Sequence, residues 1–148
     1  MSRPCVRMHL DERSTLLYFD DGATVTLPVG VRGLAEDVLR HDPPTPVELE
    51  RAIDLVEDAL ATARLAKADR GSLVIADALL RALPGLADPS PGLALDAVEA
   101  LFQRLASRAH GTPVGDAEMP RGRNVAAALL ILRECMHHLG FDRVATTQ

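Results

Sequence analysis

Residues 6–29 read VRMHLDERSTLLYFDDGATVTLPV, a pattern typical of three consecutive β-strands. Apolar and polar residues alternate over residues 6–11, which is the period of two expected of a half-buried strand. Residues 15–19 are aliphatic, β-branched or aromatic, as in a buried strand. The Asp20–Gly22 segment predicts a tight hairpin turn, because glycine readily adopts positive φ. Residues 23–29 alternate again, so the sequence predicts an antiparallel meander over residues 6–29.

The clearest local signal beyond the meander is a helix start at Thr45. Thr45 is suited to be an N-cap, Pro46 occupies the first helical position, and Glu48 completes a capping box. Apolar residues then recur at helical spacing. We therefore expect a long amphipathic helix over about residues 45–68.

Two further long helices are predicted over about residues 94–109 and 124–139, and Gly140 is placed to cap the second of them. Two short helices are predicted over residues 31–39 and 77–83. Two further strands are predicted over residues 72–76 and 141–147. Strands come first and are then separated by helices. This order predicts an α/β fold, a mixed sheet with helices packed on it, in a single domain spanning residues 1–148.

The composition is that of an ordinary globular protein. Of 148 residues, 47% are hydrophobic and 25% are charged, and the formal net charge is −5. An acidic protein is not attracted to nucleic acid or to anionic membranes, so we expect neither as a partner. The sequence shows no signal peptide and no apolar run of membrane length, and it contains two cysteines, Cys5 and Cys135. We therefore expect a cytoplasmic protein, and we also expect it to be bacterial. Nearly all of its basic residues are Arg, which is typical of GC-rich genomes.

Several segments, in the same order along the chain, resemble those of a known family. They are STLLYFDDG (14–22), LPVGVRGL (27–34), HDPPTP (41–46), LDAVEALFQRLA (95–106), PRGRNVAAALLILRE (120–134) and LGFDRV (139–144). The chain resembles the second actin-like domain of the exopolyphosphatase and guanosine pentaphosphate phosphatase family (Ppx/GppA). The resemblance implies an RNase H-like fold of order β-β-β-α-β-α-β, which agrees with the elements predicted above.

The phosphate-binding loops of that family are degenerate in this chain. In the family, the domain opens with an Asp followed by a glycine-rich loop that ends in Ser or Thr, and the matching residues here are HLDERS (9–14). Ser14 is retained, whereas the glycines are replaced by Asp11–Arg13, whose carboxylates would repel a phosphate. The second glycine loop matches residues 74–78, which contain no glycine. The first domain of the family, which shares its active site, has no counterpart in the sequence.

Three residues are candidates for binding a ligand: Ser14, Arg121 and Arg123. Ser14 is the remnant of the phosphate loop that the resemblance implies. Arg121 and Arg123 precede the last predicted helix, where unpaired N–H groups and the helix dipole favour an anion. Asn124 is the alternative at this position, because it is suited to be the N-cap of that helix.

No metal site, catalytic residue or cofactor is predicted. Cys135 and His138 are three residues apart on one helix and share a face, but the sequence offers no second pair of zinc ligands. Histidines in the last helical turn are instead expected to interact with the helix dipole, and Cys135 is expected to be a core thiol. The acidic pairs Asp11-Glu12 and Asp20-Asp21 are expected to be a solvated loop and a turn.

Two functions remain open. The first is a non-catalytic Ppx/GppA-like domain that binds a small ligand, another protein or a second copy of itself. The second is a phosphatase or a hydrolase of nucleotides or polyphosphate with a rebuilt active site. We favour the first, because the residues that would hold phosphate are missing. We expect a homodimer whose contacts come from the helices over residues 95–106 and 125–139, because these helices carry broad apolar faces.

Overall fold

The computed structural model describes residues 5–68, 70–87, 92–111 and 120–147. Within them, the strands are β1 (Cys5–Leu10), β2 (Thr15–Tyr18), β3 (Thr24–Leu27), β4 (Gly71–Ile75), β5 (Leu93–Ala94) and β6 (Phe141–Thr146). The helices are α1 (Val31–Asp37), α2 (Pro46–Ala63), α3 (Ala78–Arg81), α4 (Leu95–Ala109) and α5 (Arg123–Leu139). None of the described helices is long and apolar enough to span a bilayer.

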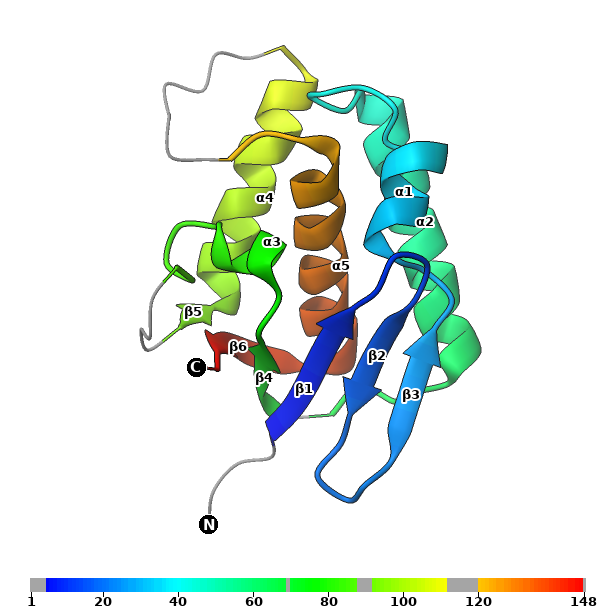
Figure 1. Cartoon of the computed structure of the whole chain (residues 1–148), viewed down its shortest axis with the longest axis vertical. Coiled ribbons are helices and arrows are strands. Elements are labelled where there is room, and N and C mark those ends of the chain that lie inside the picture. Colours follow the sequence, from blue (N-terminus) through cyan, green and yellow to red (C-terminus); the bar gives the residue numbers. More distant parts are fainter. Residues whose placement is uncertain (1–4, 69, 88–91, 112–119, 148) are drawn as a thin grey trace.

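The six strands form one mixed sheet in the order β3-β2-β1-β4-β6-β5 (Figure 1). β1, β2 and β3 pair antiparallel, which confirms the meander predicted over residues 6–29. β4 pairs parallel with β1 and with β6, so the segment predicted as a strand at residues 72–76 joins the same sheet. The two-residue strand β5 at the edge was not predicted, because Leu93 and Ala94 become a strand only by pairing with β6.

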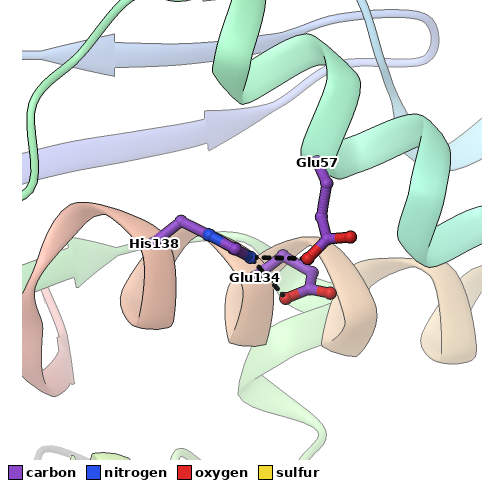
Figure 2. A group of neighbouring side chains, drawn as sticks. All are labelled: Glu57, Glu134 and His138. Atoms are coloured by element: carbon purple, nitrogen blue, oxygen red, sulfur yellow. Dashed lines mark hydrogen bonds and ion pairs between the residues drawn. The ribbon is translucent and has the colours of Figure 1, made fainter.

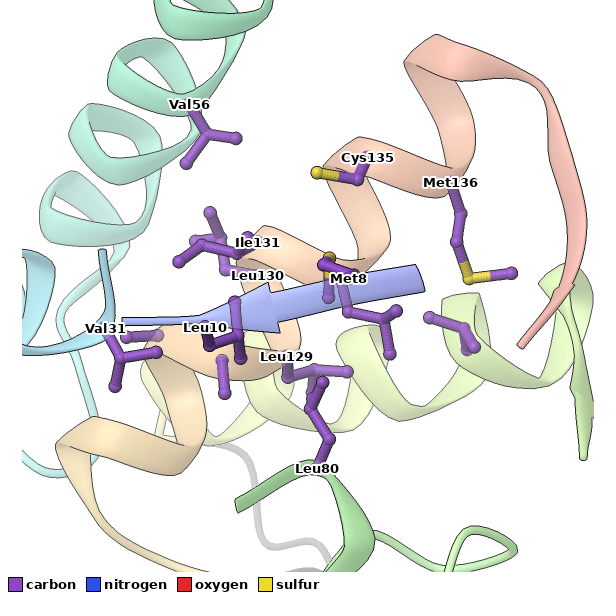
Figure 3. Close-up of a cluster of buried hydrophobic side chains, with 14 of the residues drawn as sticks. Met8, Leu10, Val31, Val56, Leu80, Leu129, Leu130, Ile131, Cys135 and Met136 are labelled. Atoms are coloured by element: carbon purple, nitrogen blue, oxygen red, sulfur yellow. The ribbon is translucent and has the colours of Figure 1, made fainter. Parts of the chain in front are cut away.

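The helices gather on one face of this sheet (Figure 1). On β1, Val6, Met8 and Leu10 are buried, whereas Arg7 and His9 are exposed on the opposite face. Figure 3 shows Met8 and Leu10 against side chains of α5 in the core. The alternation of apolar and polar residues in the sequence therefore indicates a sheet that the described helices cover on one side only.

α5 lies at the centre of the helical layer, between α1 and α2 on one side and α4 on the other (Figure 1). Twelve of its residues are buried, from Val125 to Leu139, so it has a wider apolar surface than the stripe that its spacing predicts. The apolar residues of α4 also face the core. The chain itself therefore covers the apolar faces from which the dimer contact was expected, and the homodimer stays a prediction.

α2 begins as predicted and ends earlier than predicted. The Thr45 hydroxyl accepts a hydrogen bond from the Glu48 N–H, and the Glu48 carboxylate accepts one from the Thr45 N–H, so the capping box is confirmed. The helix stops at Ala63, where Arg64 takes up the left-handed conformation with φ 56°. The following segment runs against the end of α5 instead, because the N–H of Arg70 and its side chain donate to the Gly140 and Leu139 carbonyls.

Candidate functional site

A surface pocket of about 350 Å³ opens at the carboxyl ends of β1 and β4. Its walls are the β1–β2 turn, one face of α1, the start of α3 and the first residues of α5. In open α/β sheets, ligands bind at the carboxyl ends of the parallel strands. The pocket is also where the resemblance places the degenerate phosphate loop, so it is the candidate site of this chain.

The β1–β2 turn directs its carbonyl groups toward the start of α1. The Val31 N–H donates to the Asp11 carbonyl at 3.2 Å, and the Gly33 N–H donates to the Glu12 carbonyl at 3.0 Å. These donors belong to the first turn of α1, whose N–H groups have no partner within the helix. The turn therefore caps a helix, and its Asp11 N–H is itself bonded to the Ser14 carbonyl at 2.9 Å.

Gly30 lies directly against the backbone of this turn. A Cβ on Gly30 would stand 2.4 Å from the Ser14 nitrogen and 2.5 Å from the Arg13 nitrogen. Among the described non-glycine residues, only Arg64 has positive φ, so the turn lacks the alternating left-handed geometry of an anion-binding nest. Ser14, a predicted ligand-binding residue, is half-buried in this contact and is not part of the pocket wall.

The pocket is more acidic than basic. Four carboxylates, those of Asp11, Glu12, Glu36 and Asp77, line it against the two guanidinium groups of Arg32 and Arg123. Arg32 is already engaged, because its Nε lies 2.7 Å from a Glu36 oxygen and its Nη1 lies 3.3 Å from a Glu12 oxygen. The hydrogen bond raises the pKa of Arg32 and lowers the pKa of Glu36, so this pair stays ionised near neutral pH. An incoming phosphate would therefore meet a net negative wall.

The two arginines at the start of α5, Arg121 and Arg123, do not act together. Arg123 lines the pocket, and its Nη1 donates to the Ala35 carbonyl at 3.2 Å, which ties the start of α5 to α1. Arg121 is exposed and is not part of the pocket wall. The N-cap of α5 is Gly122, and Asn124 lies inside the helix, so the alternative that Asn124 is the N-cap is wrong. Glycine fits this position because its φ is 119°, a value that disfavours side chains.

The segment that matches the second glycine loop of the family is also a helix cap. The Asp77 carboxylate accepts a hydrogen bond from the Leu79 N–H at 2.9 Å and so begins α3. The acidic pair at Asp20-Asp21 has the turn role expected of it, because the Asp21 carboxylate accepts from the Ala23 N–H at 2.9 Å. Asp77, Arg32 and Glu36 were not predicted as pocket residues, because that role depends on how α1 and α3 meet the sheet edge.

The structure separates Cys135 from His138. Cys135 is fully buried in the core (Figure 3), and burial raises the pKa of its thiol to about 12, so it is not a nucleophile near neutral pH. His138 points instead toward α2, where its Nε2 lies 2.8 Å from a Glu57 oxygen. Cys135 is therefore not one of the possible metal ligands that lie near His138 in the described part of the chain. Both cysteines are free thiols.

No protein-family model matches the sequence, and no curated protein is similar to it in sequence. The structure, however, is similar to solved structures of Ppx/GppA proteins. One is the Ppx/GppA enzyme of Aquifex aeolicus, with a TM-score of 0.72 and 20% identity over 99% of this chain and 54% of that one. Another is the type II variant of the Aquifex aeolicus Ppx/GppA phosphatase, with a TM-score of 0.72 and 18% identity over 99% of this chain and 54% of that one.

An exopolyphosphatase-like protein has a TM-score of 0.70 and 15% identity, and the match covers 98% of this chain and 56% of that one. The chain thus spans about half the length of the structures that it matches. These findings confirm the α/β, RNase H-like fold and the resemblance to a Ppx/GppA domain.

Proposed function

We propose that this chain is a non-catalytic Ppx/GppA-like domain that acts by binding, and that a second copy of the chain is its partner. The observation that carries the first part is the β1–β2 turn. Its Asp11 and Glu12 carbonyls accept from the first turn of α1, and its Arg13 and Ser14 nitrogens lie against Gly30. A phosphate cradle needs free N–H groups that converge on the anion. The charge of the pocket supports the same conclusion.

Phosphoryl transfer depends on positioning the phosphate and neutralising its charge. Loss of one preorganised donor typically lowers the rate by on the order of 10²–10³-fold. The purified chain should therefore release no phosphate from polyphosphate or guanosine pentaphosphate with Mg²⁺, above a control without protein. The Ser14→Ala and His9→Ala variants should give the same baseline. Release by the wild type that either variant abolishes would contradict the proposal.

The second candidate is a hydrolase with a rebuilt site. It is favoured by one observation, which is that carboxylates from α1, α3 and the β1–β2 turn meet at the carboxyl ends of two parallel strands. In that case Asp77→Asn or Arg123→Ala would abolish phosphate release while Ser14→Ala would not. The same assay therefore distinguishes the two functions.

Self-association is supported by the surface of α2. Leu55, with 45% of its surface exposed, forms part of the wall of a pocket of about 330 Å³, which is also lined by Pro28, Val29, Leu34 and Val38. In a two-fold dimer both subunits present the same patch, so Leu55 of each copy can enter the pocket of the other.

Sedimentation should show dimers at about 10⁻⁵ M protein, an affinity scale of about −7 kcal/mol. Leu55→Lys should shift the equilibrium to monomer. Val47→Lys is the matched control, because Val47 is also an exposed residue of α2 but does not line this pocket. A wild type that is monomeric at this concentration would contradict the proposed partner.

The two free cysteines support a reducing, cytoplasmic location, which we also propose.

A further inference from the structure

Three possible metal ligands converge between α2 and α5, far from the pocket described above. Figure 2 shows Glu57 of α2 reaching His138 and Glu134 of α5. The Nε2 atom of His138 lies 2.8 Å from Glu57 Oε2 and 3.6 Å from Glu134 Oε2. His138 and Arg123 stand at opposite ends of α5, about 20 Å apart at the rise of an α-helix.

Glu134 is the unusual member of this group. Its side chain is only 1% exposed, and its contacts are long: 3.4 Å from Oε1 to Arg133 Nη1 and 3.6 Å from Oε2 to His138. Ion-paired hydrogen bonds are normally shorter, about 2.7–2.9 Å. Arg133 is shared, because its Nε lies 2.9 Å from Glu99 on α4. The buried carboxylate is therefore only weakly paired, because its hydrogen bond from Arg133 is long and Arg133 also binds Glu99. Weak pairing of a buried charge is costly in a protein interior.

The arrangement has the chemistry of a cation site. Two carboxylates and one imidazole are the donors that zinc, manganese and related divalent ions accept. Ligand atoms bound to one tetrahedral zinc ion at about 2.0–2.2 Å lie about 3.3–3.6 Å apart. The three ligand atoms here all lie within 4.8 Å of one another, so side-chain movements of about 1 Å would bring them to that spacing. Glu57 and His138 are 41% and 37% exposed, which leaves a route from solvent to the site.

We infer that Glu57, Glu134 and His138 bind a divalent first-row transition-metal ion, and that this ion links α2 to α5. The ion neutralises the charge of the buried Glu134 carboxylate. It also replaces the hydrogen-bonded proton between His138 Nε2 and the Glu57 carboxylate. The inference is independent of the proposed function, because none of these residues lines the candidate site. The histidine and both carboxylates are needed together, since each element alone supplies too few ligands to hold such an ion.

The test is titration of the full chain, freed of metal with a chelator, with Zn²⁺ or Mn²⁺ in a calorimeter. We expect one equivalent to bind. At a hundredfold excess of the ion over its Kd, the Tm should rise by on the order of 5–10 °C. His138→Ala and Glu57→Gln should each weaken binding by more than about tenfold.

His137→Ala is the matched control, because it removes the neighbouring, exposed imidazole and should leave the affinity unchanged. Glu134→Gln is the second variant. It removes a buried charge, so the metal-free protein should be no less stable, while the rise in Tm with metal should be lost. Mn²⁺ electron paramagnetic resonance of the wild type should report nitrogen and oxygen ligands. The absence of binding below millimolar metal, or an equal loss of affinity in His137→Ala and His138→Ala, would show an ordinary ion pair only and overturn the inference.

Discussion

Gly30 is the residue on which the candidate site depends most directly. Its Cα is packed against the β1–β2 turn, and an added Cβ would meet backbone atoms at 2.4–2.5 Å. Backbone cannot rotate away as a side chain can, so Gly30→Ala should lower the free energy of unfolding by about 1–3 kcal/mol. Urea denaturation measures this change.

The matched control is Gly33→Ala. Gly33 lies within α1, and the nearest atom to its Cβ position is a side-chain nitrogen of Arg13 at 3.5 Å. Alanine favours a helix over glycine, so this variant should be as stable as the wild type or more stable by up to about 1 kcal/mol. Equal stability of the Gly30→Ala variant and the wild type would show that the turn does not pack as described.

Glu48 should make the stability of the chain depend on pH. Burial opposes the ionisation of its carboxyl, but hydrogen bonds from the Thr45 and Arg40 N–H groups and from His41 outweigh it and lower its pKa. A lowered pKa adds stability above the unfolded-state value, and that stability is lost as the pH falls through the folded-state value.

Unfolding in urea at pH 7 and at about pH 3 measures this effect. Wild type should exceed Glu48→Gln by about 0.5–1 kcal/mol at pH 7, and the difference should shrink as the pH falls through the lowered pKa of Glu48. Glu50→Gln is the control, as Glu50 is an exposed residue of the same helix. A difference that persists at low pH would mean that the Glu48 carboxylate is not the group responsible.

Elements with strong local patterns could be predicted from the sequence, and elements that depend on distant partners could not. The meander and the start of α2 follow from alternation, the Asp-Asp-Gly turn and the capping box. The end of α2 was placed too late, because nothing near Ala63 shows that Ala68 and Arg70 bond to the end of α5. β5 and the meeting of Glu57 with His138 were missed for the same reason, since each joins segments far apart in the chain.

The β1–β2 turn as an element should resist conversion to a phosphate loop. Its carbonyls are bonded to the N–H groups of α1, and those bonds do not depend on the side chains of Asp11–Arg13. Replacing all three residues by glycine should therefore leave phosphate release from polyphosphate at the level of a control without protein. Release that appears in this variant would show that the side chains alone prevent activity.

For the whole molecule, the fold resembles that of Ppx/GppA proteins, but the candidate site lacks the features of a phosphate-binding site. The sheet order and the helical layer match Ppx/GppA structures, whereas the edge of the sheet where that fold can hold a ligand is acidic, and its turn is used as a helix cap. The fold can host several functions, so the site decides between them. The central claim is that this edge does not bind phosphate.

The most direct test is a titration of the ¹⁵N-labelled chain with tripolyphosphate in the presence of Mg²⁺, followed through the backbone amides of Glu12, Arg13 and Ser14. Mg²⁺ alone is the control. The structure predicts no saturable shift of these amide resonances. Saturable shifts of these three amides with a Kd below about 1 mM, equivalent to about −4 kcal/mol, would contradict the account.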